Sequence, residues 1–148
     1  MSRHLREINK YRRKGKNLIS SNKIKPQQWD ISEAEAQEAL QAKGYNVKQI
    51  KKIHCLKHQV SISYWDNQGN ICSSFFSYRI FTRWYKEVEK LIDNCQNLKE
   101  WTRLNYVIGY EFIYYNYLSK IEYALHQLLE NRLSELKATE QQAVFQNT

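Results

Sequence analysis

Residues 98–136, LKEWTRLNYVIGYEFIYYNYLSKIEYALHQLLENRLSEL, decide the predicted architecture of the chain. The spacing of apolar side chains predicts a single helix of about 40 residues, ~60 Å long. One face of that helix carries Trp101, Leu104, Val107, Ile108, Phe112, Tyr115, Leu118, Leu125, Leu129, Leu133 and Leu136. A second apolar face lies opposite. A helix that only lines its own core needs one apolar face, so we expect this helix to contact two different surfaces.

The second face is mostly tyrosine, a residue that suits protein interfaces because it buries apolar area and keeps a polar tip. We therefore expect it to contact another copy of the chain or a larger protein assembly. In the alternative interpretation, the rest of the chain covers both faces. The expected interface residues are Tyr106, Tyr110, Tyr114, Tyr117 and Ile121.

Shorter elements precede this helix. Ser32 and Glu35 form a capping-box pattern at the start of a helix over 33–43, and Gly44 suits its end. Alternating residues predict strands over 50–56, 60–65 and 71–78, with a turn around Gly69. Residues 79–93 return to helical spacing.

These elements predict an α+β fold. It comprises an N-terminal helical basic arm, a helix, a three-stranded antiparallel meander, a further helix and a long C-terminal helix. The expected divisions are a basic arm and linker over 1–26, a helix–meander–helix module over 27–94, the long helix over 95–138 and a frayed tail over 139–148.

The order helix–strand–strand–strand–helix over 32–93 resembles that of a double-stranded-RNA-binding domain. The last helix of that family opens with a lysine cluster that contacts phosphates. The corresponding stretch here, SYRIFTRWYKE, offers Arg79, Arg83 and Lys86 instead. The resemblance is therefore one of element order, shared by many small α+β modules.

Charge is distributed unevenly along the chain. Residues 1–26 hold nine Lys and Arg against one acid, whereas residues 27–148 hold fourteen of each sign. Residues 39–65 also lack any acid, and their lysines would either extend this positive surface or protect an edge strand from pairing. A basic segment of this kind is typical of proteins that bind polyanions, so we expect nucleic acid as a partner. The expected phosphate contacts are Arg3, Arg6, Lys10, Arg12, Arg13, Lys14, Lys16, Lys23, Lys25, Lys48, Lys51 and Lys52.

Exposed aromatic rings beside these basic residues would be able to stack on bases. The candidates are Trp29, Tyr45, Trp65 and Tyr78, with burial in the core as the more common alternative for each ring. DNA and RNA, and single and double strands, are not distinguished by these residues.

Two other functions remain open at this stage. The chain would be a structural subunit if its arm contacted an acidic protein, or a small metal-dependent nuclease if Glu7, Asp30, Gln49 and Lys51 came together. Common catalytic motifs are lacking, so we lean against an enzyme and expect no cofactor, with Mg²⁺ needed only by the nuclease. The pattern His54-Cys55-x-x-His58 with Cys72 is not expected to bind metal, because adjacent strand residues face opposite ways.

Three cysteines without framework spacing indicate reduced thiols. The basic N-terminus has no apolar segment behind it, and no uncharged apolar run is long enough for a membrane span. We therefore expect a cytoplasmic protein.

Overall fold

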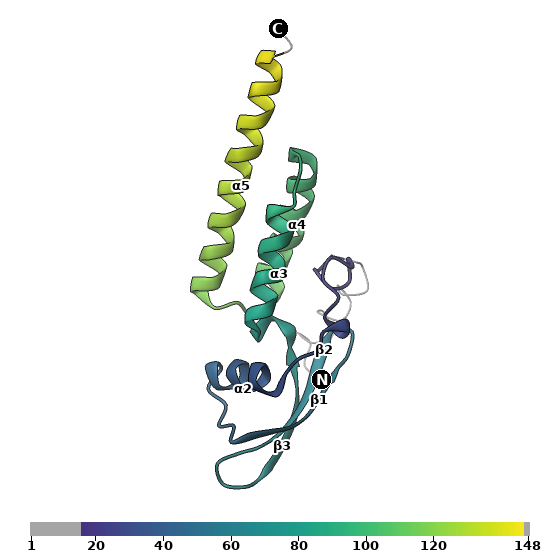
Figure 1. The fold of residues 1–148 in the computed structure, drawn as a ribbon, viewed down its shortest axis with the longest axis vertical. Helices are drawn as coiled ribbons and strands as arrows, with labels where there is room; N and C mark the ends of the chain where they lie inside the picture. Colours follow the sequence, from purple (N-terminus) through teal and green to yellow (C-terminus); the bar gives the residue numbers. More distant parts are fainter. Residues whose placement is uncertain (1–15, 147–148) are drawn as a thin grey trace. The chain divides into compact units, whose positions relative to one another are not determined.

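The structure, a computed structural model, describes residues 16–146 and confirms the predicted α+β fold (Figure 1). The expected helix of the basic arm lies outside the described residues. The chain divides into two compact units, which we describe separately. The sheet unit comprises residues 24–84, and the helical unit comprises the described residues 16–23 and 85–146.

In the sheet unit, three antiparallel strands pair in the order β1-β2-β3, as the predicted meander requires. Gly69, at φ +82°, completes the β2–β3 turn, and the side chain of Asp66 accepts the backbone N–H groups of Gln68 and Asn70. The elements of this unit are the 3-10 turn η1 (Pro26–Gln28), α2 (Glu33–Ala42), β1 (Gln49–Cys55), β2 (Gln59–Trp65), β3 (Ile71–Ser77) and the 3-10 turn η2 (Tyr78–Ile80), which leads into α3.

Local capping sets the ends of α2. The hydroxyl of Ser32 accepts the N–H of Glu35 at 3.1 Å, and Gly44 follows the helix at φ +92°. The reciprocal half of the predicted capping box is not formed. The Glu35 carboxylate instead pairs with the guanidinium of Arg83, 2.6 Å away, which ties α2 to the start of α3.

The core of the sheet unit lies on one face of the sheet, which we call the inner face. Val60, Ile62 and Tyr64 alternate inward along β2 and are buried, as the sequence predicts. Leu40 on α2 is also fully buried. The Trp29 ring packs edge-on against the ring of Tyr78, with centroids 5.4 Å apart. The sheet is thus stabilised by one packed face, to which alternate residues of β2 contribute.

The helical unit contains most of α3 (Thr82–Asp93), whose first three residues belong to the sheet unit, together with α4 (Leu98–Tyr114) and α5 (Ser119–Gln146). The prediction of a single helix over 98–136 is wrong, because the chain leaves helical geometry at Tyr115 and resumes it at Ser119. Folding back lets the apolar faces of α4 and α5 pack against each other, burying Leu104 and Ile108 with Leu125 and Leu129. The hairpin thus supplies within the unit part of the burial that a straight rod would need from a second surface, whereas Tyr106, Ile113 and Tyr123 stay exposed.

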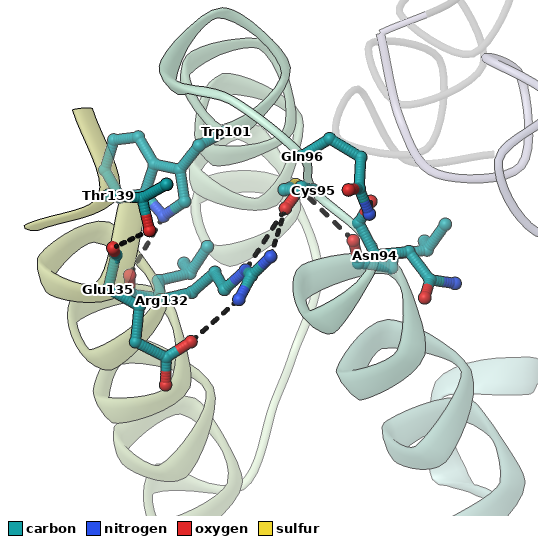
Figure 2. Close-up of polar contacts among 9 residues, drawn as sticks. Asn94, Cys95, Gln96, Trp101, Arg132, Glu135 and Thr139 are labelled. Atoms are coloured by element: carbon teal, nitrogen blue, oxygen red, sulfur yellow. Dashed lines mark hydrogen bonds and ion pairs between the residues drawn. The ribbon is translucent and has the colours of Figure 1, made fainter. Parts of the chain in front are cut away.

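Arg132 on α5 fastens the opposite end of this helical hairpin (Figure 2). Its guanidinium donates two hydrogen bonds to the carbonyl of Cys95, at 2.6 and 3.1 Å, in the α3–α4 connection. The indole N–H of Trp101 donates to the carbonyl of Leu129 at 2.9 Å, linking α4 to α5. The hydrogen bonds from Arg132 and Trp101 satisfy backbone carbonyls that helix packing removes from water.

Burial raises the pKa of the Cys95 thiol, and the nearby carboxylate of Glu100 raises it further.

A buried carboxylate holds the chain segment before residue 24 against the helices. Glu111 on α4 is fully buried and accepts the N–H of Leu18 at 3.1 Å and the hydroxyl of Tyr117 at 2.6 Å. Asn17 donates to the hydroxyl of Tyr115 at 2.9 Å. Asn17, Leu18 and the adjacent Ile19, which lie within the expected arm and linker over 1–26, are thus buried.

The end of α5 also differs from expectation. Residues 139–146, predicted to be a frayed tail, continue the helix to Gln146. Their side chains are all exposed, so the helix here rests on local propensity. Ala, Glu and Gln predominate, and Gly and Pro are absent from this segment. Among residues 16–146, no helix is both long enough and apolar enough to cross a membrane.

The Glu111 contacts predict a large effect of removing this carboxylate. Glu111→Ala removes the acceptor of the buried N–H of Leu18 and of the part-buried hydroxyl of Tyr117, at about 1–3 kcal/mol for each buried donor, so the free energy of unfolding should fall by about 2–5 kcal/mol. Urea denaturation measures this loss. Glu130→Ala, an exposed change on α5, should alter stability by less than about 0.5 kcal/mol. Equal effects of both changes would refute the role of Glu111.

The raised pKa of Tyr78 predicts that the protein loses stability at alkaline pH. Burial, and then Cys55, raise the pKa of Tyr78 above its ordinary value of 10, and its hydroxyl donates to the carbonyl of Leu56. Above pH 10 the unfolded chain loses this proton while the folded chain keeps it, so the stabilisation present below pH 10 declines as pH rises. Urea titrations at increasing pH should therefore show a steeper decline for the wild type than for Tyr78→Phe, by up to about 1.4 kcal/mol per pH unit. Parallel declines would contradict this.

Candidate functional site

The second face of the sheet, which we call the outer face, includes three rows of paired residues that span all three strands, and the further pair Gln59–Ser77. Directly paired residues of antiparallel strands project to the same face, and the inward alternation of β2 assigns the remaining residues outward. One row runs across β1, β2 and β3 at each of three levels of the sheet. The rows are Gln49–Trp65–Ile71, Lys52–Ser63–Ser73 and His54–Ser61–Phe75.

The β3 side of the outer face is apolar and exposed. The Phe75 side chain is 60% exposed and that of Ile71 is 56% exposed, whereas the neighbouring Phe76 is buried on the inner face. An unpaired phenyl ring of this exposure contributes little to folding, because it keeps most of its surface in water. Exposed apolar groups gathered on one face often mark a binding surface.

The β1 side of the outer face is cationic. Lys52 and His54 are exposed, and none of the three strands, all of which lie within the described residues, contains Asp or Glu. Lys51 occupies a break in register between Ile50 and Lys52, and its ammonium group lies 5.8 Å from the centroid of the Trp65 ring. The irregularity thus places a cation beside an aromatic ring.

Small hydroxyl side chains separate the cationic and apolar sides. Ser61 and Ser63 on β2 are half-buried, Ser73 on β3 is exposed, and the hydroxyl of Ser73 donates to that of Ser63 at 3.0 Å. Serine leaves a low surface between larger neighbours, and each hydroxyl can donate and accept hydrogen bonds. The outer face therefore combines positive charge, hydrogen-bonding groups and an exposed ring within three strands.

The structure places the sequence-predicted basic residues in different parts of the chain. Lys16 and Lys23 belong to the helical unit, whereas Lys25, Lys48, Lys51 and Lys52 belong to the sheet unit. Lys48, Lys51 and Lys52 come together at β1, and all three are exposed. The remaining predicted contacts lie outside the described residues: Arg3, Arg6, Lys10, Arg12, Arg13 and Lys14.

The predicted stacking aromatics have different fates. Tyr78 is fully buried, which is the alternative expected for these aromatics, and Trp29 packs against it. Tyr45 is 45% exposed but packs edge-on against Phe76. Trp65 lies on the outer face. Sequence reasoning did not select Phe75, because alternation along β3 separates Phe75 from Phe76 without showing which one faces the core.

The residues of the nuclease alternative do not form one cluster. Glu7 lies outside the described residues. Asp30 follows Trp29, whose carbonyl oxygen lies 3.8 Å from the Cys55 sulfur at the end of β1. Gln49 lies at the start of the same strand, about 20 Å from Cys55. Within residues 16–146, no group of three His, Cys, Asp or Glu side chains is placed to hold a metal ion.

The predicted interface tyrosines of the helical unit are divided between core and surface. Tyr106 is 63% exposed, whereas Tyr110 is buried with its ring 4.5 Å from that of Tyr114. Tyr117 donates to Glu111, and Ile121 is half-buried. These residues therefore do not form one exposed stripe, and their contact with a partner stays a prediction.

Arg79 in η2 and Arg83 at the start of α3 are engaged within the sheet unit. Arg79 lies over the ring of Trp84, 4.6 Å from its centroid. Arg83 contacts Glu35, the carbonyl of Asp30 and the ring of Trp29. This use differs from the phosphate-contacting lysine cluster of double-stranded-RNA-binding domains. No family model, curated protein or solved structure matches the chain.

The two adjacent phenylalanines of β3 test the assignment of the faces. Phe76→Ala empties a core position and should lower the free energy of unfolding by about 3–5 kcal/mol. Phe75→Ala removes a mostly exposed ring and should change it by less than about 1 kcal/mol. Chemical denaturation of both variants measures the difference, and a larger loss for Phe75→Ala would mean that the faces are reversed.

Proposed function

We propose that this protein binds nucleic acid through phosphate contacts made by the lysines around β1. The observation that carries the proposal is the acid-free cationic side of the outer face. Residues 39–65 contain five Lys and two His without any Asp or Glu. Adjacent cations attract a polyanion and release its counterions on binding.

The surroundings of these lysines support the proposal. Lys43, Lys48, Lys51, Lys52 and Lys57 are all exposed, and the sheet unit contains only Asp30, Glu33, Glu35, Glu38 and Asp66 as acids. Four of those acids precede β1, in or near α2, and Glu35 is already paired with Arg83. The strands therefore keep positive charge that nearby carboxylates do not neutralise. The arm over 1–16 adds seven further Lys and Arg against one acid.

Lysine contacts of this kind favour affinity over sequence specificity. A flexible ammonium group contacts phosphate as a point charge and carries no information about the bases. We therefore propose a protein that binds many sequences with similar affinity and whose affinity falls steeply with salt. The alternative is a structural subunit that binds an acidic protein. In that case polyglutamate should compete with nucleic acid for the same lysines.

The salt dependence of binding tests this proposal. A variant with Lys48, Lys51, Lys52 and Lys57 changed to Gln loses four candidate phosphate contacts. The slope of log affinity against log salt should decrease by about three, at roughly 0.7 to 0.9 per contact. Fluorescence anisotropy with a labelled oligonucleotide across a salt series measures the slope.

The matched control removes the same charge from the helical unit. Lys86, Lys99, Lys120 and Lys137 are also exposed, and their change to Gln should leave the slope nearly unaltered. Equal losses in both variants would show diffuse attraction rather than a site at β1. Competition by polyglutamate as strong as that by nucleic acid would instead favour the acidic protein partner.

A further inference from the structure

We infer that the outer face binds single-stranded nucleic acid, with a base stacked on the ring of Phe75. This inference rests on the proposed function and specifies its ligand. Phe75 is 60% exposed, and it ends the row that begins with His54 on β1 and continues through Ser61. An exposed imidazole and an exposed ring thus face the same side of the sheet across a small residue, and the exposed Lys52 lies on that side in the adjacent row.

The dimensions of the row suit one nucleotide lying across the strands. His54 and Phe75 are separated by two strand spacings, about 10 Å, which an extended nucleotide can span. The phosphate would lie at β1, near Lys52 and His54, and the base at β3. The small side chain of Ser61, in the middle of the row, leaves room above β2 for the nucleotide.

The other rows of the outer face each contribute part of this arrangement. Ser63 and Ser73 follow Lys52, and the Trp65–Ile71 pair offers a second aromatic and apolar surface beside the ammonium of Lys51. Successive residues on one face of a strand are about 7 Å apart, so Phe75 and Ile71 are separated by about 13 Å. Hydroxyls between these two positions can bond to base edges or to the sugar–phosphate backbone.

Stacking distinguishes single strands from duplexes. Bases in a duplex have both faces occupied by their neighbours, whereas an unpaired base can leave its stack and cover an aromatic side chain. Phe75 carries only a ring and cannot contact phosphate by charge. Its exposure beside cations therefore has a use in binding unpaired bases that it lacks in binding a duplex backbone.

Charge disfavours a second copy of the chain as the occupant of this face. Packing two outer faces together would bring the lysines of both β1 strands into one interface without a carboxylate from any of the three strands. Burying like charges in this way is unfavourable. A polyanion supplies the missing negative charge, and its bases supply the flat apolar surface.

Binding of the full chain to three probes tests the inference. The probes are a labelled oligothymidylate, the same oligomer with abasic sites, which keeps every phosphate, and a duplex of equal length. The wild type should bind oligothymidylate more tightly than either of the other probes. Phe75→Ala should weaken binding of oligothymidylate by about five- to a hundredfold, leave binding of the abasic oligomer unchanged and keep the salt slope of the wild type.

Two further variants separate stacking from general effects. Phe75→Trp keeps an aromatic face and should retain affinity, whereas Phe75→Leu keeps apolar volume only and should lose it. Phe145→Ala removes an equally large ring that is 81% exposed on α5 and should have no effect. Oligomers of DNA and RNA with the same bases show whether the sugar matters.

The outcomes separate failure of this inference from failure of the proposed function. Equal affinity of the wild type for the intact and abasic oligomers, with a steep salt slope, would overturn base stacking and leave phosphate binding in place. Tighter binding of the duplex would also overturn the inference. Binding of none of the probes at low salt would refute the proposed function itself. A fall in solution mass caused by Phe75→Ala would assign the face to self-association and overturn the inference.

Discussion

The two-residue repeat of the strands is the constraint on which the account depends. Because side chains alternate between the faces of a strand, burying Val60, Ile62 and Tyr64 on the inner face forces Ser61, Ser63 and Trp65 outward. Strand pairing then determines which residues of β1 and β3 lie on each face, because directly paired residues project to the same side. The segregation of Lys52 and His54 from the core, and the exposure of Phe75, are consequences of the register as well as of composition.

The helical unit depends on contacts between residues that are distant in sequence. Glu111 bonds to Leu18, 93 residues earlier, and Arg132 bonds to Cys95. A fully buried carboxylate is unfavourable unless hydrogen bonds replace its hydration. Glu111 meets this condition with a backbone N–H and a tyrosine hydroxyl. The same contacts fix the residues that directly precede the sheet unit.

Local signals predicted the sheet unit well, because its elements follow from short-range chemistry. Ser32, Gly44 and Gly69 occupy the cap and turn positions expected of them, and β2 alternates as predicted. The break between α4 and α5 was missed because apolar spacing continues through residues 115–118 without Gly or Pro. The burial of Glu111 could not be predicted, since its partners come from other parts of the chain. The candidate site was half predicted: its lysines follow from charge, whereas Phe75 needs the pairing register.

The most direct test of the account is a map of backbone amide shifts on titration of the full chain with oligothymidylate, observed by nuclear magnetic resonance. The account predicts that the largest shifts within residues 16–146 fall in β1, β2 and β3, with residues of the outer face such as Lys52, Ser73 and Phe75 among them. Shifts confined to α4 and α5, or an absence of shifts in the three strands under conditions where binding occurs, would contradict it.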